Sequence, residues 1–155
     1  MNLNIIIIIL LISSSRILAG EISGVPSITD GDTIKISNKR IRFHGVDTPE
    51  KKQICIKNFQ EYACGIEATD ALIKKINGNQ VLCKVHDRLD RYKRYVGVCF
   101  VRGVNLNRWM VRNGFAVAYR RYSRDYVKDE DYAKKNKLGL WAGSFIHPEK
   151  WRKLN

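Results

Sequence analysis

The chain has 155 residues and a formal net charge of +13, with basic residues scattered along its length. This length fits one domain with a real hydrophobic core, and the sequence contains no internal repeat. The apolar run Ile5–Ile12 is far shorter than the roughly 20 residues that a membrane-spanning helix needs. The charge indicates a polyanionic partner more strongly than a plain basic surface, and it does not indicate a particular fold.

The N-terminal segment 1–19 is interpreted as a secretory signal peptide that is cleaved, since small residues, Ala19 and Gly20, follow its apolar run. No Lys or Arg precedes that run, so an uncleaved N-terminal anchor is the alternative, and only then would the protein contact a membrane. The predicted domain is 20–146, followed by a basic tail, 147–155, which we expect to be loosely held. The protein is therefore expected to be exported, either secreted or periplasmic.

Five short strands are predicted in the domain. The segments 24–28, 32–37 and 39–46 form a meander whose first turn is "TDGD", and 81–85 and 95–100 form a hairpin around a polar loop. This inventory predicts an α+β fold that is mainly β, a five-stranded OB-type barrel with about three helices.

Three helical segments follow from hydrophobic spacing and stop signals. The first, 64–78, carries Ile66, Leu72, Ile73 and Ile76 roughly on one face. A second, short helix lies within 104–114. The third, within 123–141, has early acids and late lysines, as the helix dipole favours.

Four cysteines behind an export signal predict two disulfides. Cys83 and Cys99 are equally distant from Arg91, at the middle of the hairpin loop, so a symmetric antiparallel hairpin places them opposite each other. Cys55 is then left to pair with Cys64. A metal site is the alternative for these cysteines, but no CxxC spacing supports one.

Two acidic turns are candidate cation ligands in this basic chain. "DGDT" on its own is a common hairpin turn, but Asp32 lies where the chain re-enters a strand. In "FHGVDTPE", Asp47 and Glu50 flank Pro49, which restricts Thr48 to an extended backbone and so directs its carbonyl. Carboxylates and a carbonyl are all oxygen donors, which suits a hard cation such as Ca²⁺.

Basic residues near these acids are candidate phosphate ligands. Arg42 and Asp47 are five residues apart, so they converge only if the strand bends, and Gly45 is the natural position for a bend. A surface arginine on an edge strand is the alternative reading. The loop "DRLDRYKRY", 87–95, combines forked guanidinium donors with tyrosines that offer stacking faces, although a solvated loop would have similar composition.

Together the motifs "DGDT", Arg42, "VDTPE", "DRYKR" and "AKKNKLGLW" resemble the staphylococcal nuclease (thermonuclease-like) family in order and near-family spacing. The resemblance runs from about Val25 to Trp141. It implies an exported, disulfide-containing nuclease that uses Ca²⁺ to hydrolyse the P–O5′ bonds of DNA and RNA with little sequence specificity, leaving 3′-phosphates. It implies no obligate protein partner, and a monomer is the default.

The resemblance also assigns residues. It implies Ca²⁺ ligation by Asp32, Asp47 and the Thr48 carbonyl, catalytic roles for Arg42, Glu50 and Arg94, and substrate contacts from Arg91, Tyr92 and Tyr119. Of these, Glu50 corresponds to the acid that activates water, while Arg42 and Arg94 correspond to the arginines that stabilise charge on the phosphate. Tyr122 competes with Tyr119 for its role.

One departure from the family is Lys93, where relatives usually have Gly. If this position needs a positive φ, lysine costs about 1 kcal/mol and could shift Arg94.

Two other functions agree less well with the sequence. A catalytically silent OB-fold module that binds single strands would have little reason to place acids against a polyanion. A cationic toxin or envelope-binding protein would leave the acids and arginines together unexplained.

Overall fold

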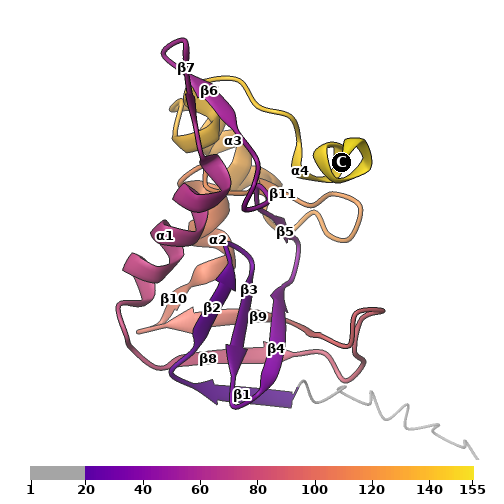
Figure 1. Cartoon of the computed structure of the whole chain (residues 1–155). Coiled ribbons are helices and arrows are strands. Elements are labelled where there is room, and N and C mark those ends of the chain that lie inside the picture. The colour runs from indigo at the N-terminus through magenta and orange to yellow at the C-terminus, as the bar shows by residue number, and fades with distance from the viewer. Residues whose placement is uncertain (1–19) are drawn as a thin grey trace, which may run out of the picture.

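The structure is a computed structural model that describes residues 20–155, so the predicted signal peptide lies outside the described residues. A curled antiparallel-and-parallel sheet dominates it, with strand order β1-β8-β9-β4-β3-β2 and β10 paired to β9 (Figure 1). Its strands are β1 (Gly20–Gly24), β2 (Ser27–Asp30), β3 (Thr33–Ile36), β4 (Lys39–Phe43), β8 (Val81–Val85), β9 (Tyr95–Val101) and β10 (Val104–Asn105). This half-closed sheet confirms the predicted mainly-β, OB-type fold.

The predicted meander is β2-β3-β4, and β4 closes the sheet by pairing in parallel with β9. Thr33 is opposite Arg42 between β3 and β4, and Arg42 is opposite Val96 between β4 and β9. The pairing with β9 therefore holds Arg42 in a central strand of the sheet.

Two small sheets complete the β-structure. β5 (Val46–Asp47) pairs with β11 (Val117–Ala118), and β6 (Cys55–Lys57) pairs with β7 (Gln60–Tyr62). The β6–β7 hairpin projects from the body, whereas β5 and β11 lie beside α4 (Figure 1).

The three predicted helices are confirmed as α1 (Cys64–Ile76), α2 (Leu106–Arg112) and α3 (Val127–Lys135). A 3₁₀ turn follows at Gly139–Ala142. The predicted apolar face of α1 is partly wrong. Leu72 and Ile76 are buried with Ala68, one turn apart on one row, whereas Ile66 and Ile73 lie on another row and are exposed.

The expectation of a loosely held tail is wrong, because a fourth helix, α4 (Pro148–Leu154), follows the domain. Pro148 is buried at the first turn, Glu149 is early, and Arg152 and Lys153 are late, which matches the helix dipole. Ion pairs from Glu149 and Arg152 attach α4 to the rest of the molecule. The tail is therefore a docked element.

Both predicted disulfides are present, Cys83–Cys99 and Cys55–Cys64. Cys83 and Cys99 are directly opposite in the β8–β9 register, as hairpin symmetry predicts. The core between the sheet and α1 and α2 includes Ile34, Ile41, Phe43, Leu72 and Met110. Within residues 20–155, no helix has the length and apolarity required to cross a bilayer.

Candidate active site

Asp32 is buried in the turn between β2 and β3, where the chain re-enters the sheet. Its Oδ2 accepts hydrogen bonds from the backbone N–H of Thr48, at 2.9 Å, and from the Thr48 hydroxyl, at 2.8 Å. The Thr33 hydroxyl donates to Oδ1 at 3.1 Å. These bonds join the two acidic turns, although the turns are sixteen residues apart in the sequence.

Arg42 lies between the two carboxylates that are predicted metal ligands, Asp32 and Asp47. Its Nη1 is 2.8 Å from Asp32 Oδ2, and its Nη2 donates to Asp47 Oδ1 at 3.2 Å. Gly45, at φ +67°, supplies the bend that brings Arg42 and Asp47 to the same side. A side chain on Gly45 would also press on Ser123 and Tyr126, so the bend has little room.

Burial and ion pairing shift the pKa values of the carboxylates in different directions. Burial alone would raise the pKa of Asp32, but Arg42 and the hydrogen bonds from Thr48 outweigh it and lower that pKa. Burial raises the pKa of Asp47 to about 6, even though Arg152 and Arg42 oppose the increase. Asp30 also has a pKa raised to about 6, by burial and by the nearby charge of Asp32. The site therefore concentrates acids that need cationic partners.

Arg94 reaches the same site from the β8–β9 loop. Its Nη1 is 3.5 Å from the Thr33 hydroxyl, which itself donates to Asp32. Asp90 orients Arg94, accepting from Nε at 2.9 Å and from its backbone N–H at 2.9 Å. Lys93 has φ +57°, so the position that precedes Arg94 does adopt the left-handed backbone.

Glu50 and Asp47 share a partner that the sequence analysis did not identify, Arg152 of α4. Its Nη1 is 2.9 Å from Asp47 Oδ1 and 2.8 Å from Glu50 Oε1, and its Nη2 donates to Asp47 Oδ2 at 3.0 Å. Burial would lower the pKa of Arg152, but Asp47 and Glu50 raise it. Because Arg152 and Asp47 are 105 positions apart, no local motif could have joined them.

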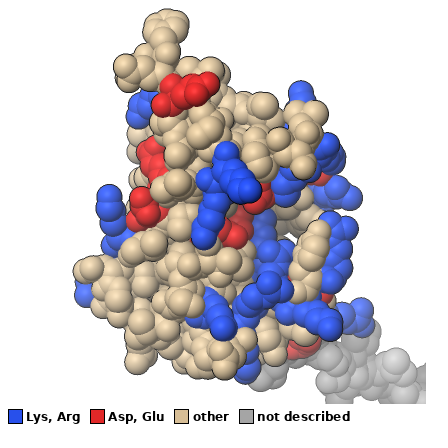
Figure 2. All heavy atoms as spheres, in the orientation of Figure 1, with Lys and Arg blue, Asp and Glu red and all other residues tan. Residues whose placement is uncertain are grey.

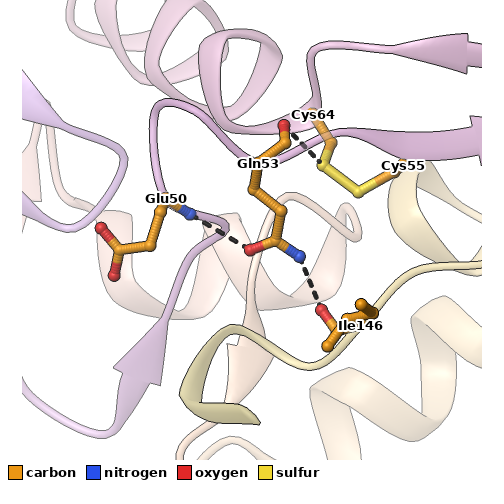
Figure 3. Close-up of a disulfide and its surroundings, with 5 residues drawn as sticks. All are labelled: Glu50, Gln53, Cys55, Cys64 and Ile146. Atoms are coloured by element: carbon orange, nitrogen blue, oxygen red, sulfur yellow. Dashed lines mark hydrogen bonds between the residues drawn. A yellow bond between two sulfur atoms is a disulfide. The ribbon is translucent and has the colours of Figure 1, made fainter. Parts of the chain in front are cut away.

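Gln53 fixes the loop that carries Glu50. It is fully buried, and its Oε1 accepts from the backbone N–H of Glu50 at 3.3 Å (Figure 3). Its Nε2 donates at 2.6 Å to the carbonyl of Ile146, which lies just before α4. Its own carbonyl is 3.4 Å from Sγ of Cys64, in the disulfide with Cys55. Glu50, the disulfide and the start of α4 are thus joined through one residue that no sequence motif marked.

The predicted substrate contacts lie at the rim. Tyr92 is exposed, and the guanidinium carbons of Arg91 and Arg94 lie 4.7 Å and 5.1 Å from its ring centre. Tyr119 Oη is 3.5 Å from Arg152 Nη2, and its ring packs edge-on against Tyr122 at 4.8 Å. Tyr119 is therefore nearer to the acids, while Tyr122 supports it from the solvent side.

The surface around this site is basic. Lys and Arg outnumber Asp and Glu along the side of the molecule where the β8–β9 loop and α4 lie (Figures 1 and 2). The buried acids at the centre of this surface are paired with Arg42 and Arg152, and a phosphate that drew these arginines away would need another cation beside the carboxylates. The arrangement suits a phosphodiester bound with a metal ion better than a phosphate bound by arginines alone.

The sequence comparisons agree with this geometry. Residues 40–143 match the family described as "Staphylococcal nuclease homologue". An "Uncharacterized endonuclease" of Escherichia coli O157:H7 is 35% identical over 154 residues, covering 94% of each chain. The "Succinoglycan biosynthesis protein ExoI" of Rhizobium meliloti is 35% identical over 83% of this chain and 69% of its own. "Staphylococcal-like nuclease CAN1" of Arabidopsis thaliana is 35% identical over 74% of this chain and 33% of its own.

Proposed function

The chain belongs to the staphylococcal nuclease family and is a nuclease, and from this premise we propose that it is an exported, Ca²⁺-dependent enzyme acting on DNA and RNA. It would cleave P–O5′ bonds with little sequence preference and leave 3′-phosphates. The observation that carries the proposal is the contact of one guanidinium group, Arg42, with two buried carboxylates, Asp32 and Asp47. Arg94 Nη1 is 3.5 Å from the Thr33 hydroxyl, which in turn donates to Asp32.

The residues proposed to hold Ca²⁺ are Asp32, Asp47 and the backbone carbonyl of Thr48. The donor chemistry fits, because all three supply oxygen, which Ca²⁺ prefers. The Asp47 side chain is only 1% exposed and already contacts two guanidinium groups, so this position attracts positive charge. Residues 20–155 contain no group of three or more His, Cys, Asp and Glu that could hold a metal, so water and substrate would supply the remaining ligands.

The chain's own residues are proposed to divide the reaction as follows. Glu50 accepts a proton from water, and the resulting hydroxide bonds to phosphorus in line with the P–O5′ bond. That bond breaks, and the O5′ alkoxide, whose charge Arg94 stabilises, takes a proton from solvent water. Arg42 and Arg94 donate to the phosphate oxygens on which charge develops. Bound Ca²⁺ would polarise the phosphate as a Lewis acid.

Single strands, or locally opened ones, are the proposed substrates. Arg91, Tyr92 and Tyr119 would hold the neighbouring phosphate, sugar or base at the rim, with contacts that need no particular base. The two disulfides are typical of proteins that fold in oxidising compartments, which supports export. We propose a signal peptide at 1–19, a nuclease domain at 20–146 and a basic C-terminal segment at 147–155, acting as a monomer without an obligate protein partner.

The test is to incubate the oxidised protein, beginning at Gly20, with plasmid DNA and with RNA, first with Ca²⁺ and then with chelator. We expect degradation that needs Ca²⁺ and yields 3′-phosphate ends. Glu50→Gln should retain nucleic-acid binding while turnover falls about 10²–10³-fold, as for loss of a preorganised catalytic group. Degradation unaffected by chelator would reject the metal, and binding without degradation under either condition would favour the silent module.

A further inference from the structure

Arg152 places a guanidinium group on the same carboxylates that the proposed reaction needs. It makes paired contacts with both oxygens of Asp47 and one with Glu50, all between 2.8 and 3.0 Å. We propose that Arg152 is an internal counter-cation that competes with the divalent cation for Asp47, so that α4 sets the cation affinity of the site. This inference rests on the proposed function.

The contact has the geometry of a specific ion pair. The flat, forked guanidinium matches a carboxylate with two parallel hydrogen bonds, which a lysine cannot do. Asp47 is buried, and the Arg152 side chain is 34% exposed, so the pair is shielded from water on the side of the acid. Arg152 also neutralises Glu50, whose charge would otherwise face that of Asp47 across a short gap.

The same contact excludes the cation. Both oxygens of Asp47 accept from Arg152, and Arg42 shares one of them. A divalent ion bound to Asp47 would lie within a few ångströms of the Arg152 charge, where like charges in a shielded site repel strongly. Arg152 and the ion therefore cannot both keep Asp47. While Glu50 holds Arg152, its Oε1 already accepts from the guanidinium group and is not available to water.

The contacts of α4 are weak enough for the helix to dissociate from the rest of the protein. It has seven residues, too few to be stable as an isolated helix. Apart from Arg152, its ion pair with the body joins the exposed Arg121 to Glu149 at 3.0 Å, a surface pair of small energy. The segment before α4 is held more firmly, by the bond from buried Gln53 to the Ile146 carbonyl (Figure 3). Pro148 is also buried at the start of α4, so the part of the helix that would move lies beyond it, where Arg152 makes the contacts with Asp47 and Glu50.

The experiment measures Ca²⁺ binding by calorimetry at fixed ionic strength, without substrate. Arg152→Gln should lower the Ca²⁺ dissociation constant about tenfold, the equivalent of losing one hydrogen bond to a charged group. Arg152→Lys, which keeps the charge but loses the fork, should lower it severalfold. Lys153→Gln is the matched control on α4, because the ion pair of Lys153 is with Glu149 in the same helix, and it should stay within about twofold of wild type.

A second readout follows the helix itself. In the wild-type protein, backbone amides of 149–155 should exchange hydrogen faster when Ca²⁺ is added, while those of α1 should not. Equal Ca²⁺ affinity in wild type and both Arg152 variants would overturn the inference and leave the proposed nuclease intact. Failure of all four proteins to bind Ca²⁺ would instead reject the metal assignment on which the inference rests.

Discussion

Lys93 has a left-handed backbone, φ +57°, immediately before Arg94. The turn is closed by the Lys93 N–H, which donates to the carbonyl of Asp90 at 2.9 Å. A side chain in this conformation costs about 1–2 kcal/mol. Arg94 keeps its bonds to Asp90 despite this cost, so the position of the predicted catalytic arginine is maintained by the Asp90 carboxylate rather than by the turn alone.

Lys93→Gly should therefore stabilise the protein. We expect the free energy of unfolding in urea to rise by about 0.5–1 kcal/mol, since the relief of strain exceeds the entropy that glycine loses on folding. Lys35→Gly is a matched control, because Lys35 is exposed in the extended strand β3, and it should lower the free energy by about 0.5–1 kcal/mol. A loss of stability in Lys93→Gly equal to that of the control would show that the turn stores no strain.

Among the elements, one disulfide lies inside the sheet and the other lies beside the loop that carries Glu50. Cys83–Cys99 covalently links β8 to β9 inside the sheet. Cys55–Cys64 joins the start of β6 to the start of α1 and lies against Gln53, which orients Glu50. The first disulfide therefore supports the scaffold, whereas the second also supports the loop that carries the proposed general base.

Replacing each disulfide by a pair of alanines separates these roles. Either replacement should lower the free energy of unfolding by about 2–5 kcal/mol. At a temperature where both variants remain folded, loss of Cys55–Cys64 should lower nuclease turnover at least about tenfold more than loss of Cys83–Cys99, because a small displacement of a catalytic group is costly. Equal activity in the two variants would mean that the Cys55–Cys64 disulfide does not help to place Glu50.

Glu130 connects α3 to β11. Its side chain is fully buried, accepts from the backbone N–H of Ala118 at 3.0 Å and pairs with Arg120 and Lys134. Burial opposes ionisation, but these three partners outweigh it and lower the pKa of Glu130 below its usual 4.5. Because the folded-state pKa is the lower one, this group contributes stability above about pH 4.5, and that stability is lost as the pH falls through the folded-state value.

Glu130→Gln should consequently lower the free energy of unfolding by about 1–3 kcal/mol at pH 7. The difference from wild type should shrink as the pH is reduced from 6 to 3, as followed by urea unfolding at each pH. Asp131→Asn, an exposed neighbour on α3, should stay within about 0.5 kcal/mol of wild type at pH 7. A difference between Glu130→Gln and wild type that is constant with pH would contradict the lowered pKa.

Across the whole molecule, the features that the sequence predicted are those with local causes. The Cys83–Cys99 pair follows from the symmetry of one hairpin, and the meeting of Arg42 with Asp47 follows from one bend at Gly45. Arg152 could not be predicted in the same way, since its contact with Asp47 depends on how the last helix docks on the body. Three of its neighbours in α4, Pro148, Glu149 and Lys153, did carry helix signals. The presence of the helix was therefore predictable from the sequence, but its position on the body was not.

The basic charge of the protein is a property of the whole molecule. A basic surface around a buried acidic centre favours binding of nucleic acid through phosphates, so affinity should fall as salt is added. That behaviour would be shared by a silent binding module. What separates the nuclease from such a module is where the phosphate lies relative to the acids, which affinity alone does not report.

The most direct measurement is a crystal structure of Glu50→Gln with Ca²⁺ and a short single-stranded DNA. We expect one Ca²⁺ bound by Asp32 and Asp47, with a phosphate of the strand between this ion and the guanidinium groups of Arg42 and Arg94. An ion bound elsewhere, or a strand that crosses the basic surface without reaching these four side chains, would contradict it.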